Sequence, residues 1–117
     1  MRPKASSYIL FGFLVCDFEA SSERKGEFSE LEDSILLSDE PVGPDVAMLR
    51  SVHVGDARSF YVGFLLCRGT WSEAEEIDTE KLAAVNTAVN VEALRTFCAR
   101  HGLEFRDPRF LLLSEYW

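Results

Sequence analysis

The segment Ser7–Glu19 reads SYILFGFLVCDFE and is rich in aromatic and β-branched side chains, with no polar face of helical spacing. This composition predicts a β-strand. Alternate residues of a strand lie on opposite faces of its sheet, and both faces are apolar here: Tyr8, Leu10, Leu14, Cys16 and Phe18 on one, Ile9, Phe11, Phe13 and Val15 on the other. We therefore expect this strand at the centre of a sheet that is covered on both sides.

A second segment repeats the pattern of the first. Val62–Cys67 (VGFLLC) echoes Phe11–Cys16 (FGFLVC), and six residues are too few to indicate a duplication. We interpret the echo as two central strands with the same packing requirement, whose glycines either allow a close approach of backbones or accommodate large aromatic neighbours across the strands. The second strand, 58–68, follows the strand 46–54 through a turn at Gly55, as in a β-hairpin.

The rest of the chain supplies one more strand and a helical region. Residues 108–117 form a strand with two apolar faces, and helices are predicted at about 79–89 and 91–101 with a break near Asn90. Gly102 is placed to end the second helix. The sequence thus predicts a single α+β domain over 1–117, with residues 1–6 as a mobile N-terminus. Its mostly antiparallel sheet has about four strands (7–19, 46–54, 58–68 and 108–117), with both helices packed on one face.

Acidic residues are concentrated in the stretch 17–45. Ten acids (Asp17, Glu19, Glu23, Glu27, Glu30, Glu32, Asp33, Asp39, Glu40 and Asp45) stand there against two bases, which gives a local charge equal to the −8 of the whole chain. Residues 20–27 look like a loop. Phe28, Leu31 and Ile35 then have the spacing of a short amphipathic helix, although 34–38 also fits a strand. An apolar stripe of this kind predicts an ordered acidic surface, and residues 73–80 hold a second acidic patch.

Three strands with two apolar faces need two covering layers, and the predicted helices supply one. Either the segment Phe28–Leu37 covers the other face or a second subunit does, in a homodimer. We favour the first arrangement, because this segment is apolar enough to help.

Charge and cysteine spacing exclude several classes of protein. Direct binding to nucleic acid or to an anionic membrane is disfavoured, because both require clustered bases. Cys16, Cys67 and Cys98 are too few and too widely spaced for a disulfide framework, which favours reduced cysteines and a cytoplasmic protein. The run Tyr8–Cys16 after two bases mimics a secretory signal, but it lacks a small-residue cleavage site.

Sequence motifs for catalysis are weak. Cys98 and His101 share a helical face, and Ser51, His53 and Asp56 surround the hairpin turn, but packing and turn formation explain them adequately. No phosphate-binding loop, metal site or cofactor site is predicted. The alternative is a small dimeric ligand-binding domain or enzyme with an aromatic-lined pocket. Its expected lining is Tyr8, Phe64, Trp71 and Tyr116.

In size and acidity the chain resembles phage-encoded nucleic-acid mimics, including anti-CRISPR proteins, and acidic toxin-immunity proteins. This resemblance implies a non-enzymatic inhibitor with a basic protein partner, whose nucleic-acid-binding or toxic site the acids would occupy. The expected partner-binding residues are Asp17, Glu19, Glu23, Glu27, Glu30, Glu32, Asp33, Asp39 and Glu40.

Overall fold

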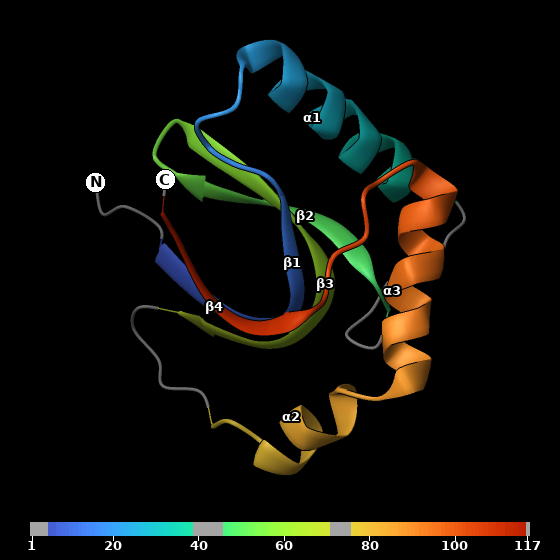
Figure 1. Cartoon of the computed structure of the whole chain (residues 1–117). Coiled ribbons are helices and arrows are strands. Elements are labelled where there is room, and N and C mark those ends of the chain that lie inside the picture. Colours follow the sequence, from blue (N-terminus) through green and yellow to red (C-terminus); the bar gives the residue numbers. More distant parts are fainter. Residues whose placement is uncertain (1–4, 39–45, 71–75, 117) are drawn as a thin grey trace.

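The computed structural model (Figure 1) describes residues 5–38, 46–70 and 76–116. Its elements are the strands β1 (Ala5–Cys16), β2 (Met48–Val54), β3 (Ala57–Thr70) and β4 (Arg109–Tyr116), and the helices α1 (Ser22–Leu37), α2 (Thr79–Val85) and α3 (Ala88–His101). The predicted α+β class and the mostly antiparallel four-stranded sheet are confirmed.

The sheet curls into a closed barrel with the strand order β1-β3-β2-β4 (Figure 1). β1 lies between β3 and β4, because it pairs antiparallel with β3 over residues 6–16 and with β4 over residues 5–12. β2 pairs antiparallel with β3, and on its other side it meets β4 in the one parallel contact between the described strands. That seam is narrow: it consists of the pair Val54 and Tyr116 and a hydrogen bond of 3.0 Å from the Gly55 N–H to the Tyr116 carbonyl.

Two glycines bring β1 and β3 unusually close together, and they are the glycines of the repeated sequence pattern. Gly12 lies opposite Gly63 in the register of the two strands. A β-carbon on Gly12 would lie 1.9 Å from the carbonyl oxygen of Val62, and one on Gly63 would lie 2.5 Å from that of Phe11. Of the two roles expected for these glycines, a close approach of backbones is the one that the structure shows.

The two faces of the sheet have separate cores. Inside the barrel, Tyr8, Leu10, Val52 and Leu113 form one buried cluster. On the outer side, a larger cluster joins strand residues such as Phe11, Phe60 and Val62 to side chains from all three helices. The favoured arrangement, with Phe28–Leu37 over the second face, is therefore wrong. The sheet covers its inner face by curling on itself, and α1 joins α3 on the outer cluster.

Several predicted boundaries need correction. Residues 17–19 lie beyond the end of β1, and residues 22–27, expected as a loop, form the first turns of α1. The Ser21 hydroxyl accepts a hydrogen bond from the Arg24 N–H at 3.2 Å, so a polar stretch starts a helix by capping it. The helical region breaks at residues 86–87 and not near Asn90, because Thr87 caps α3. Ala5 and Ser6 belong to β1, and residues 1–4 lie outside the described ranges.

Candidate acidic interaction site

The outer surface of α1 carries a row of carboxylates. Glu23, Glu27 and Glu30 are four and three residues apart, a spacing that places side chains on one side of a helix, and Asp33 lies beside them. All four are exposed. None of them takes part in an ion pair among the described residues. We call these four residues the acidic stripe.

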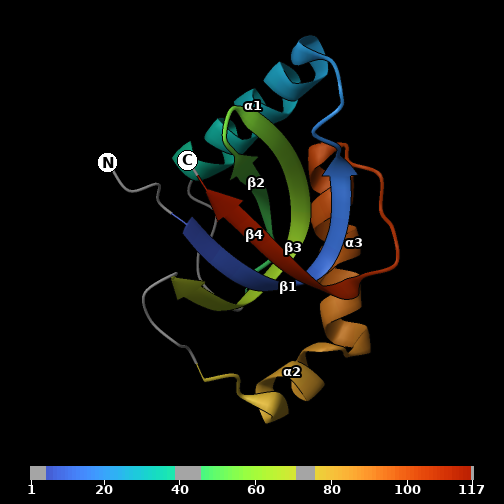
Figure 2. The ribbon, with the colours of Figure 1, turned by 90° about the vertical axis from the view of Figure 1, so that its left-hand side faces the viewer.

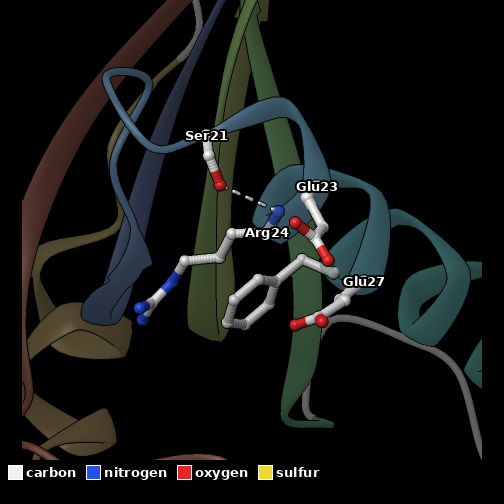
Figure 3. A pocket seen from close by; sticks show the side chains of 5 residues that line it. Ser21, Glu23, Arg24 and Glu27 are labelled. Carbon is white, nitrogen blue, oxygen red and sulfur yellow. Dashed lines mark hydrogen bonds between the residues drawn. The ribbon is translucent and has the colours of Figure 1, made fainter.

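Arg24, one of the two bases of the same segment, points away from the acidic stripe (Figure 3). Figure 3 shows Glu23 and Glu27 on one side of the helix, while Arg24 extends in another direction. The Arg24 guanidinium carbon lies 5.9 Å from the centre of the Phe28 ring. Arg24 also lines a hollow of about 390 Å³ between the start of α1, the end of β1 and Arg106. The acidic stripe therefore keeps its charge, because the nearest arginine does not neutralise it.

The opposite side of α1 anchors the helix to the barrel. The Phe28 ring stacks on Phe60 of β3 with a centroid distance of 5.6 Å, and Leu31 and Ile35 contact the same cluster. The Ser29 hydroxyl accepts a hydrogen bond of 3.3 Å from Arg58. No residue of α1 is fully buried, so the helix rests on half-buried side chains and leaves its outer surface free.

Glu32 differs from the other acids of α1, because its carboxylate faces the barrel. Its Oε2 accepts a hydrogen bond of 2.6 Å from the Ser51 N–H, and its Oε1 accepts one of 3.1 Å from the Ser51 hydroxyl. Glu32 is half-buried, unlike the four exposed residues of the acidic stripe. The structure thus separates Glu32 from the acidic stripe and gives it a structural contact with β2.

The remaining predicted partner-binding residues flank the acidic stripe or lie beyond the described chain. Asp17 and Glu19 are exposed in the turn before α1, where the Asp17 side chain accepts a hydrogen bond of 3.3 Å from the Glu19 N–H. Asp39 and Glu40 fall outside the described residues. The described part of the second acidic patch lies at α2, at the opposite end of the molecule from α1 in both ribbon views (Figures 1 and 2).

A buried carboxylate that the sequence analysis missed joins three strands. Glu115 of β4 is 4% exposed, accepts hydrogen bonds from the Tyr8 hydroxyl and, at 3.1 Å, from the His53 N–H, and lies 3.7 Å from the Arg50 guanidinium. Arg50 also lies over the Tyr8 ring, 4.2 Å from its centre. The available signal was the strand alternation, which puts Glu115 on the same side as the buried Leu113.

The weak catalytic motifs do not assemble into a catalytic arrangement. The Ser51 hydroxyl lies 3.4 Å from His53 Nε2, and the carboxylate of Glu32 binds the serine hydroxyl at 3.1 Å. A catalytic triad needs the opposite order, with the acid orienting the base. Cys98 is buried, which raises the pKa of its thiol, and the His101 ring packs on Phe97.

The other predicted sites are also dispersed. No group of three potential metal ligands occurs in the part of the chain that the structure describes. Tyr8 and Phe64 of the expected aromatic pocket belong to the inner and outer clusters, on opposite faces of the sheet. Tyr116 is half-exposed, and Trp71 lies outside the described residues. Among the described helices, none combines the length and apolar composition needed to cross a membrane.

No protein-family model, no curated protein and no solved structure matches this chain. Its function is therefore argued from its own geometry and charge.

Proposed function

We propose that this chain is a non-enzymatic inhibitor that occupies a basic, nucleic-acid-binding site of another protein with the acidic stripe of α1. The observation that carries the proposal is the row of exposed carboxylates at Glu23, Glu27, Glu30 and Asp33, without ion-pair partners among the described residues. A basic groove that normally holds phosphates attracts such a row.

The spacing of the stripe supports this function. A helix rises about 1.5 Å per residue, so the carboxylates of Glu23, Glu27 and Glu30 follow each other at axial steps of about 6 Å and about 4.5 Å. Successive phosphates of one B-DNA strand are separated by about 3.4 Å along the axis, which is a comparable density of charge. Because α1 is anchored through Phe28, these carboxylates are already ordered before binding, and less conformational entropy is lost in the complex.

The kind of partner follows from the resemblance in size and charge. An anti-CRISPR or other nucleic-acid mimic would compete with DNA or RNA for its partner, whereas a toxin-immunity protein would cover the basic surface of one toxin. Both would act in the cytoplasm. We favour the mimic, because the stripe lies along one straight helix, as charges do along a nucleic-acid strand.

The experiment compares two triple variants of equal charge. One reverses the stripe (Glu23→Lys, Glu27→Lys and Glu30→Lys), and the other reverses three exposed acids elsewhere (Glu76→Lys, Glu104→Lys and Asp107→Lys). Each substitution adds two charges, so both variants change from −8 to about −2. Glu32 is left intact, because its reversal would break the contact with Ser51.

Each protein is used as bait in pulldowns at low and at high salt, with and without competing duplex DNA or RNA. We expect the wild type and the control triple to recover a basic protein that salt and nucleic acid displace, and the stripe variant to lose it. Equal recovery by both triple variants would show that only net charge matters, and this would refute the assignment to α1. Recovery that nucleic acid does not displace would favour the toxin-immunity alternative.

A further inference from the structure

An apolar surface is exposed on the outer side of β4. Phe110, Leu112, Ser114 and Tyr116 alternate along this side, and Leu112 is 75% exposed. Ile9 of β1 lies opposite Leu112 in the strand register, and Cys67 of β3 lies opposite Ile9. These six residues define what we call the β4 face.

The helices cover the neighbouring part of the same sheet but not the β4 face. Phe11 and Phe13 of β1 are buried in the outer cluster, whereas Ile9, two residues earlier on the same side of the strand, is only half-buried. In Figure 2 the strand β4 and the start of β1 face the viewer, and no helix passes in front of them. The molecule therefore leaves one end of an apolar sheet surface open to solvent.

The β4 face also carries no charge, although 27% of the chain is charged. The charged neighbours along β4, Arg109 and Glu115, lie on the other side of the strand by alternation, and Glu115 is buried there. This neutrality decides what kind of partner fits. In a two-fold symmetric contact each surface meets the same surface of the other copy, so a net charge on it would repel its own copy. The chain has a net charge of −8, so its charged surfaces disfavour contact between two copies elsewhere.

We propose that the β4 face binds a second copy of this chain in a two-fold symmetric dimer. A two-fold axis between Leu112 and Ser114 places Phe110 of each copy opposite Tyr116 of the other, with the two sheets packed face to face. The face has far fewer residues than the roughly 20–30 per partner that stable complexes of standard size bury. The dimer is therefore weak, with a dissociation constant on the order of 10 μM.

Sedimentation equilibrium of the full chain from about 1 μM to about 500 μM tests the dimer, because this range brackets the expected constant. We expect the average mass to rise from the 13.2 kDa of the monomer towards twice that value. Leu112→Asp and Leu112→Lys should each weaken association by about tenfold or more, because each puts like charges together near the axis. Val89→Asp, at a residue of α3 that is 78% exposed, should leave the dimer unchanged.

An equimolar mixture of Leu112→Asp and Leu112→Lys separates self-contact from other causes of weakened association. Opposite charges then meet across the axis, so the mixture should associate more tightly than either variant alone. Circular dichroism and urea unfolding check that each variant is folded. A monomeric wild type at every concentration, a dimer that tolerates Leu112→Asp, or a mixture of folded variants that stays monomeric would each overturn the proposal.

Discussion

Glu32 of α1 holds the backbone of β2 through Ser51, with its Oε2 2.6 Å from the Ser51 nitrogen and its Oε1 3.1 Å from the hydroxyl. On the same strand, the His53 N–H donates to Glu115 at 3.1 Å. Two carboxylates from different elements thus satisfy two N–H groups that β2 does not pair with a neighbouring strand. Unpaired groups on a strand edge favour aggregation, so these contacts protect the narrow β2–β4 seam.

Replacing Glu32 should destabilise the fold although most acids of α1 are dispensable. We expect Glu32→Ala to lower the free energy of unfolding by about 1.5–3 kcal/mol, because hydrogen bonds to a charged group are lost and the half-buried Ser51 N–H loses its partner. Glu30→Ala, at an exposed position two residues away, should stay within about 0.5 kcal/mol. Urea denaturation measures both, and equal values would contradict the structural role of Glu32.

The paired glycines of β1 and β3 should tolerate no side chain. In Gly12→Ala the new β-carbon meets backbone atoms of Val62 and Gly63, which cannot rotate away, so we expect a loss of about 3 kcal/mol or more. Gly69→Ala is the matched control on β3, because its β-carbon meets nothing within 4 Å. It should be neutral or stabilise the protein by up to about 1 kcal/mol. Thermal unfolding measures both variants. Equal unfolding temperatures for Gly12→Ala and Gly69→Ala would disprove the close packing of β1 and β3 at Gly12.

Removing the buried carboxylate should open the barrel seam. Glu115→Ala leaves the Tyr8 hydroxyl, the His53 N–H and the Arg50 guanidinium without their common partner, at an expected cost of about 3 kcal/mol. Hydrogen exchange of the His53 amide should accelerate more than that of amides within β3. The control is Glu104→Ala, which removes an exposed ion pair with Arg106 and should cost less than about 0.5 kcal/mol. Unchanged exchange at His53 would show that Glu115 does not hold the seam.

The buried thiol of Cys98 predicts a loss of stability in alkali. Burial raises its pKa above the ordinary 9.0, so the folded state keeps the proton while the unfolded state releases it. The stabilisation of the folded state by the protonated Cys98 thiol is fully present below about pH 9. It is lost as the pH rises towards the pKa of the folded state, and the free energy of unfolding falls by at most about 1.4 kcal/mol per pH unit. The difference in unfolding free energy between wild type and Cys98→Ala, measured in reductant, should therefore shrink above pH 9. A constant difference would contradict the prediction.

The sequence predicted most of the elements because their signals are local. Alternating apolar residues around Tyr8, the repeated VGFLLC pattern and the turn at Gly55 identified the strands, and Gly102 ended α3 where expected. The start of α1 was missed because residues 22–27 are polar and lack an apolar stripe, so that the cap at Ser21 was the only local signal.

Contacts between distant segments explain what the sequence analysis missed. Glu32 looks like the other acids of its segment, and only its position beside Ser51, 19 residues away, distinguishes it. The role of Glu115 depends on Tyr8, which is 107 residues away in the sequence. Neither contact produces a periodic pattern in the sequence, because each depends on how the strands and helices are placed in space.

The sequence by itself determined the strand-forming segments, the two apolar faces of β1 and the concentration of acids between residues 17 and 45, because these follow from local composition and alternation. Only the tertiary structure decided how the second apolar face is covered. A covering helix, a partner and a curled sheet all satisfy the same pattern, and the choice among them depends on how distant strands pair into a closed barrel. The same folding step turns Glu32 inward and leaves the acidic stripe and the β4 face outside.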